Sequence, residues 1–160
     1  MPVYNTPSPR RGFTYWMLAR SEFAPVVVGV TESETSLLAL RRAASEAAQR
    51  ASPLHVIAGG PPEVGLASVA EDERERHTIS SILRMPQVTI SIVDDTSPET
   101  LATYCMNVAA SLLVIGCDDR AGEADLESPA TTHRLVDEAR CDVLVVHAPQ
   151  GVGTATHLTG

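Results

Sequence analysis

The chain has 160 residues, which suits one domain, and a formal net charge of -8, which argues against a nucleic-acid partner. Nucleic-acid binding needs a dense cationic patch, and the 12 basic residues form none. No apolar run approaches the ~20 residues that cross a membrane, and the start of the chain does not read as a signal peptide. We therefore expect a cytoplasmic protein with no membrane partner.

Residues 1–24 differ in composition from the rest. Three prolines favour an extended start, and five of the six aromatic residues fall here: Tyr4, Phe13, Tyr15, Trp16 and Phe23. The segment is either an unstructured extension or an arm whose residues 13–23 dock on the domain or on a second subunit, because aromatic side chains in water tend to become covered. Met17 is a possible internal start.

Five short apolar runs alternate with helical patterns between residues 25 and 149, which we take as the domain. The runs are Val26 to Val30, Leu54 to Ala58, Val88 to Val93, Leu112 to Ile115 and Val143 to Val146. Alternating strands and helices predict an α/β fold, a three-layer α/β/α sandwich around a five-stranded parallel sheet. Residues 150–160 are rich in Gly and Thr and are expected to be a flexible tail.

The helical segments carry start signals. Ser33 caps the first, in which apolar residues recur at helical spacing: Leu37, Leu40, Ala44, Ala47, Ala48 and Ala51. A weaker helix passes through the charged residues 71–76, a solvated face, into Ile79. Ser-Pro pairs open the last two at Ser97 and Ser128, and the third places Cys105 in the core.

Two stretches resemble universal stress proteins. Residues 25–57, PVVVGVTESETSLLALRRAASEAAQRASPLHVI, resemble the first strand, helix and second strand of that family. Residues 111–149, SLLVIGCDDRAGEADLESPATTHRLVDEARCDVLVVHAP, resemble its last two strands and the helix between them, and Asp94-Asp95 with Ser97-Pro98-Glu99 resembles the intervening junction. The resemblance implies a Rossmann-like sheet order of 3-2-1-4-5.

The resemblance also implies a homodimer that forms through the last strand. The interface residues would be Val143, Leu144, Val145, Val146 and His147. An uncharged strand at a sheet edge is a pairing template that natural proteins rarely leave bare. We therefore expect a second copy to cover it.

The family's ATP-binding pattern has decayed in this chain. Its nucleotide-binding members carry an acidic residue at the end of the first strand, where this chain has Thr31, and the signature G-x-x-G, nine residues, then G and Ser/Thr. Counting from Gly116, the second glycine falls on Asp119, the third on Pro129 and the hydroxyl residue on Ala130. Only Gly116 survives, at the switch point where such sheets bind ligands.

These replacements should abolish ATP binding. Phosphate is bound by backbone N–H groups at a glycine turn, whereas Pro129 has no N–H, Ala130 has no hydroxyl and Asp119 adds a negative charge. Losing two charge-assisted hydrogen bonds lowers affinity by roughly 10² to 10⁴-fold. Arg120 is the one basic residue among the acidic residues between 118 and 127. This acidic segment is either a solvated connection or a binding site for a cation or an Arg-rich partner. A carboxylate at Glu127 is also favourable because it lies at a helix N-terminus.

Other candidate chemistry is sparse. The three cysteines, Cys105, Cys117 and Cys141, contain no C-x-x-C pair, which predicts reduced thiols without a metal or redox motif. Cys117 could be an exposed thiol, but neighbouring carboxylates would raise its pKa and make it a poor nucleophile, and Cys141 fits buried packing. His133 and His147 have no acid or nucleophile at a suitable spacing, so we expect no catalytic residue and no metal.

Two functions remain open. The first is a non-enzymatic, homodimeric interaction or regulatory module of the stress response that binds no cofactor and acts through an unidentified protein partner. The second is binding of ATP, AMP or another small molecule in the Thr31/Gly116 crevice, with weak or no hydrolysis.

Overall fold

The computed structural model describes residues 24–122, 125–148 and 155–158. The N-terminal extension is therefore outside the described residues, except for Ala24. The strands are β1 (Val26–Val30), β2 (Leu54–Ala58), β3 (Val88–Ile92), β4 (Leu112–Cys117), β5 (Asp142–His147) and β6 (Ala155–Leu158). The helices are α2 (Glu34–Arg50), α3 (Pro62–Ala67), α4 (Glu73–Leu83), α5 (Pro98–Val108) and α6 (Pro129–Glu138).

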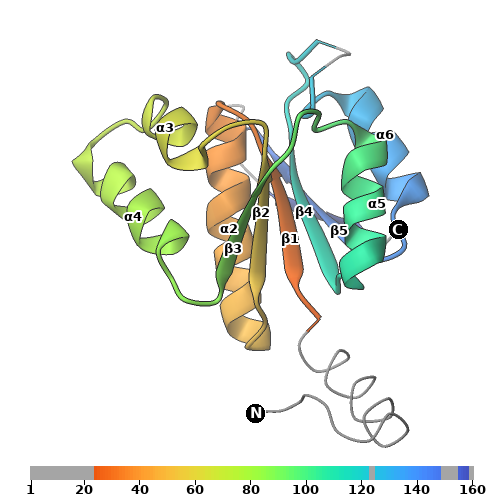
Figure 1. The fold of residues 1–160 in the computed structure, drawn as a ribbon. Helices are drawn as coiled ribbons and strands as arrows, with labels where there is room; N and C mark the ends of the chain where they lie inside the picture. Colours follow the sequence, from red (N-terminus) through yellow and green to blue (C-terminus); the bar gives the residue numbers. More distant parts are fainter. Residues whose placement is uncertain (1–23, 123–124, 149–154, 159–160) are drawn as a thin grey trace, which may run out of the picture.

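The sheet has the order β3-β2-β1-β4-β5-β6. Its first five strands are parallel, which confirms the predicted order 3-2-1-4-5. β1 lies at the centre and pairs with both β2 and β4, with Val26 opposite Leu54 on one side and Leu112 on the other. Because parallel strands end at the same edge, the segments after β1, β2 and β4 meet at the upper end of the sheet in Figure 1.

The helices form two layers. Figure 1 shows α2, α3 and α4 on one face of the sheet and α5 and α6 on the other. Successive side chains of a strand point to opposite faces, so Val26 and Val28 join one buried cluster while Val27 joins the other. The alternation of strand and helix thus produces the predicted three layers.

The predicted caps are present. The side chains of Ser33, Ser97 and Ser128 each accept a hydrogen bond from a backbone N–H in the first turn of α2, α5 and α6. The core face of α2 is rotated from the expected one: Ala43 and Ala47 are buried, whereas Ala48 is exposed. Ala51 is also exposed, because the chain leaves the helix there in a left-handed conformation with φ of 51°.

The segment between β2 and β3 contains two helices rather than the single one predicted. α3 is a short helix with proline in its first turn, and a six-residue helix is too brief to show a period of 3.6. α4 begins at Glu73 with Asp72 as its cap. Its charged first turns are mostly exposed, as predicted, and Ile79, Ile82 and Leu83 are buried.

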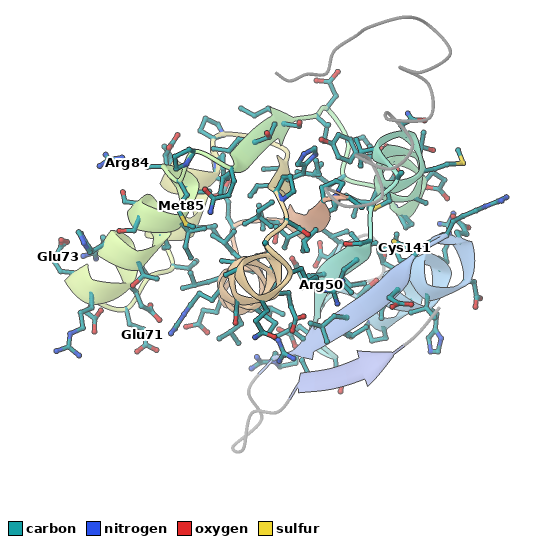
Figure 2. All side chains as sticks on the ribbon, turned by 90° about the horizontal axis from the view of Figure 1, so that it is seen from below. Arg50, Glu71, Glu73, Arg84, Met85 and Cys141 are labelled. Carbon is teal, nitrogen blue, oxygen red and sulfur yellow. The ribbon has the colours of Figure 1, made fainter. Side chains whose placement is uncertain are left out.

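The end of the chain differs from the sequence-based expectation. Residues 155–158 of the predicted flexible tail form β6, which pairs antiparallel with β5 from Val143 to Val146 (Figure 2). The strand β5 is therefore not an edge strand, and those four residues are between 0% and 7% exposed. His147 is half-buried and lies opposite Cys117 of β4. The predicted dimer surface is occupied by the chain itself.

Candidate functional site

The candidate site lies at the carboxyl ends of β1 and β4, where the order of the strands reverses. Thr31 directly follows β1, and Gly116 is the penultimate residue of β4. The N-terminus of α2 and the turn before α6 enclose the same place. The structure thus brings Thr31 together with two segments far away in the sequence.

A buried carboxylate fills the centre of this site. The side chain of Glu127, a residue that is only 6% exposed, accepts a hydrogen bond of 2.7 Å from the Thr31 hydroxyl and one of 2.6 Å from the Ser36 hydroxyl. Both bonds reach the same oxygen, Oε2. The carboxylate therefore occupies two hydroxyl donors, one after β1 and one in the first turn of α2, that a ligand anion would use.

The backbone of Thr31 is also engaged. Its N–H donates to the Ser36 hydroxyl oxygen at 2.7 Å. Ser36 lies in the first turn of α2 and is fully buried, so it links the end of β1 to Glu127. Sequence reasoning placed Glu127 in a solvated acidic connection and at a helix N-terminus, and the burial of its side chain corrects the solvated reading. It did not single out Ser36, because neither residue belongs to a spacing motif.

The loop after β4 closes on itself rather than opening to an anion. The N–H of Asp118 donates to the carbonyl oxygen of Glu127 at 2.8 Å. Arg120, the cation of this loop, donates through Nε to Asp118 at 3.2 Å. Backbone and side-chain hydrogen bonds from Arg120 lower the pKa of Asp118, and the same pairing raises the pKa of Arg120.

The N-terminus of α6 has its own cap. The Ser128 hydroxyl accepts from the Thr131 N–H at 3.1 Å, and Pro129 contributes no N–H in the first turn. Of the three residues that replace the family's ATP signature, Asp119 and Ala130 are exposed and Pro129 is half-buried. These three residues lie around the turn, and the side chain of Glu127 occupies its centre.

Gly116 has a packing role. A Cβ atom added there would lie 2.4 Å from Cγ2 of Thr35 and 3.0 Å from its carbonyl oxygen. Real Cβ atoms do not approach other atoms so closely, so glycine is needed for α2 to pack on β4. The one residue retained from the signature is therefore explained without a ligand.

A pocket of about 390 Å³ lies beside the crevice. It is bounded by the ends of β1 and β2 and by α3, and its lining includes Val30, Thr31, Ala58, Gly65 and Thr96. The lining is largely apolar and includes Glu32, whose side chain packs against Gly65. Sequence reasoning missed this pocket because α3, which forms one wall, was not predicted.

The remaining candidate residues lie in the core or on the surface of α6. Cys117 is buried rather than exposed, and burial raises the pKa of its thiol, with a smaller contribution from the nearby carboxylates. His133 is exposed on α6. In the described ranges, no three His, Cys, Asp or Glu side chains are grouped so that they could hold a metal ion. No helix there is long and apolar enough to cross a bilayer.

Comparisons with known proteins agree with this architecture. The sequence model of the universal stress protein family matches residues 22–147. A crystal structure of a universal stress protein in complex with cAMP aligns with a TM-score of 0.59 at 24% identity, covering 79% of this chain and 98% of that chain. Universal stress protein UspA from Lactobacillus plantarum aligns with a TM-score of 0.56 at 18% identity, covering 77% and 97% of the two chains. No curated protein sequence matches significantly.

Proposed function

The chain belongs to the universal stress protein family, and from this premise we propose that it is a non-enzymatic interaction or regulatory module that has lost the means to bind ATP phosphates. One observation carries the proposal. The carboxylate of Glu127 accepts the hydroxyl hydrogen bonds of Thr31 and Ser36 at the switch point of the sheet. An internal anion thus takes the place of a bound one.

Electrostatics supports the same conclusion. A phosphate oxygen about 4 Å from the Glu127 carboxylate would be repelled by roughly 4 kcal/mol at an effective dielectric constant near 20. Arg120 offers little compensation, since it is paired with Asp118 in its own loop. ATP would have to displace a buried, hydrogen-bonded carboxylate before its phosphates reached a donor.

The homodimer needs a different description from the one expected from sequence. A second copy can pair with β5 only where β6 has left it, because β6 uses the outer edge of Val143 to Val146. We propose that the dimer forms when β6 is detached and the outer edge of β5 has no partner strand. Its protein partners would bind the same edge by strand addition.

Calorimetry with Mg-ATP and AMP tests the loss of phosphate binding. We expect no binding tighter than about 100 μM for either nucleotide, and the same result for Glu127→Gln, because Pro129 and Asp119 remain. Glu127→Gln removes the negative charge and keeps the shape of the side chain. Tight binding of Mg-ATP by the unmodified chain would overturn the proposal.

The second candidate function is binding of an uncharged small molecule in the 390 Å³ pocket. Its apolar lining favours it, and one similar structure is a universal stress protein in complex with cAMP. Adenosine is the suitable probe, because it carries no phosphate. If the protein binds adenosine but not AMP, this second function is supported. Gly60→Leu should then abolish adenosine binding by filling the pocket, because an added Cβ at this position meets no atom within 4 Å.

A further inference from the structure

The strand β3 has a bare outer edge. It is the outermost strand of the sheet and pairs with β2, and among the described residues no other strand lies beside it. Natural sheets prevent pairing at an edge with charged residues, prolines or bulges. The sequence of β3, VTISI, has no charge and no proline, and its register with β2 runs without a bulge from Val88 to Ile92. The side chain of Ile92 is 58% exposed. The edge is therefore open to a further strand.

The backbone of β3 directs its even-numbered residues outward. The Val93 N–H donates to the Ala58 carbonyl oxygen of β2 at 2.8 Å, so the odd-numbered residues of this strand face β2. Among the even-numbered ones, the Val88 N–H is bonded to the preceding turn. The N–H groups of Ile90 and Ile92 are therefore the donors that a further strand would meet.

We propose that residues 13–18 of the chain's own N-terminal segment add to the outer edge of β3 as an antiparallel strand. This run, FTYWML, has neither charge nor proline, and four of its six positions hold aromatic residues or threonine, which are frequent in strands. The composition of the segment indicates docking without saying where, and the edge of β3 supplies the place. Neither Glu127 nor the crevice takes part, so the inference does not rest on the proposed function.

The length of the connection selects the antiparallel direction. The described chain begins at Ala24, before β1, and β1 and β3 both start at the lower edge of the sheet in Figure 1. A strand outside β3 lies three spacings of ~4.8 Å, about 14 Å, from β1. The six steps from residue 18 to Ala24 cover about 20 Å when extended, which is enough if residue 18 lies beside the start of β3. In a parallel strand residue 18 would lie beside Ile92, about 20 Å further along the sheet than Ala24 and about 24 Å away in all, beyond the reach of the connection.

The charges agree with this direction. In the antiparallel arrangement residue 13 lies beside the end of β3, and Arg10 and Arg11 lie just beyond it in the sequence. The end of β3 leads into Asp94 and Asp95, which are exposed. Opposite charges thus meet, an arrangement that favours this register more than it adds to stability. The tether also favours the chain's own segment over a second copy, because it holds the run near β3 at an effective concentration of roughly millimolar, whereas two chains of net charge -8 repel each other.

The fluorescence of Trp16 reports this contact, because Trp16 is the only tryptophan of the chain. In the 160-residue protein we expect acrylamide to quench it at least about twofold less than N-acetyltryptophanamide, since a neighbouring strand shields the ring. Ile92→Pro removes an outward N–H and keeps the bonds to β2, because an edge strand tolerates proline where the N–H faces away from the sheet. It should restore quenching, whereas Ile92→Val, which keeps the N–H, should not.

Two substitutions in the segment test the other side of the contact. Thr14→Pro and Tyr15→Pro change adjacent residues, whose N–H groups point to opposite sides of a strand, so one of the two faces β3 in every register. That variant should restore quenching of Trp16 and speed amide hydrogen exchange at Ile90 at least about tenfold. Asn5→Pro lies outside the run, is the matched control, and should change neither quantity. All three positions precede β1, so the domain keeps its strands and helices.

Three results would overturn the inference. The first is a Trp16 that is quenched as strongly as the reference compound in the unsubstituted protein. The second is shielding of Trp16 that persists in a folded Ile92→Pro or in both Thr14→Pro and Tyr15→Pro, which would place the segment elsewhere. The third is shielding that rises with protein concentration together with a dimer in light scattering, which would make a second copy the occupant. If Ile92→Pro failed to fold, the two substitutions in the segment would decide.

Discussion

The hydroxyl of Ser36 donates a hydrogen bond of 2.6 Å to the carboxylate of Glu127, across 91 positions of the sequence. This bond joins the first turn of α2 to the turn before α6, the two segments that border the carboxyl end of the central strands. Both residues are buried. The carboxylate that links the two helices is therefore the same group on which the proposed loss of phosphate binding rests.

Removing the Glu127 carboxylate should destabilise the fold. Glu127→Ala breaks two charge-assisted hydrogen bonds and leaves the buried Ser36 hydroxyl and the half-buried Thr31 hydroxyl with poorer partners, so we expect a loss of about 2–3 kcal/mol in the free energy of unfolding. Urea denaturation measures it. Glu63→Ala, which removes an exposed glutamate from α3, is the matched control and should change stability by less than about 0.5 kcal/mol. Equal losses in both variants would refute the role of Glu127.

Gly116→Ala should also destabilise the protein, by about 1–3 kcal/mol. The new methyl would overlap Cγ2 and the carbonyl oxygen of Thr35, and the backbone contact cannot be relieved by a rotamer change. Thr35→Ser in the same chain removes Cγ2 and should restore part of the loss. Thermal unfolding compares these variants with Gly60→Ala, whose Cβ meets nothing within 4 Å. If Gly60→Ala were the more harmful change, the packing explanation for Gly116 would fail.

The parts of the fold that repeat a local signal were predictable from sequence. Buried parallel strands produce apolar runs, and Ser-Pro pairs mark helix starts, so the positions of the five parallel strands and the starts of α5 and α6 were correct. The resemblance to a family supplied the order, which no periodicity contains. The short helix α3 and the strand β6 were not predicted, because each is too short to show a clear hydrophobic period.

The centre of the site was not predictable, because its contacts are made by residues distant in sequence. The spacing motif directed attention to Asp119, Pro129 and Ala130, which stand around the turn. Glu127 lies in the same loop, but only the three-dimensional structure shows that its side chain turns inward to meet Ser36. A buried carboxylate and a solvated one are identical in sequence.

Stability should fall in mild acid because of His55. Its Nδ1 lies 2.7 Å from the Tyr104 hydroxyl, and burial lowers the pKa of the ring below 6.5. The unfolded chain therefore takes up a proton before the folded one does, and stability is lost as the pH falls through 6.5. The loss from this residue at pH 5.5 is at most about 1.4 kcal/mol, and partial exposure of the ring reduces it. Urea unfolding at pH 7.5 and 5.5 should show a smaller change for His55→Gln than for the exposed control His77→Gln.

Ala51→Gly should stabilise the protein by roughly 0.5–1 kcal/mol. Ala51 ends α2 with φ of 51°, a conformation that is strained for alanine and free for glycine. The same substitution at Ala48, an exposed residue inside α2, should instead cost about 1 kcal/mol. We therefore expect thermal denaturation to show a raised melting temperature for Ala51→Gly and a lowered one for Ala48→Gly. A lower melting temperature for Ala51→Gly would contradict the assignment of strain to that position.

Removing the last strand should change the oligomeric state. A chain that ends at Ala148 lacks β6 and leaves the outer edge of β5 without a partner, so we expect the shortened protein to dimerise at micromolar concentration while the full chain remains a monomer. Thr156→Pro keeps the length of the chain but places a residue without an N–H opposite Val145, and it should shift the protein in the same direction. Deletion of residues 159 and 160 alone, beyond β6, is the control. Size-exclusion chromatography with light scattering distinguishes the species. If the shortened chain were folded and monomeric, or the full chain an equally strong dimer, β6 would not be what prevents a second copy from pairing with β5.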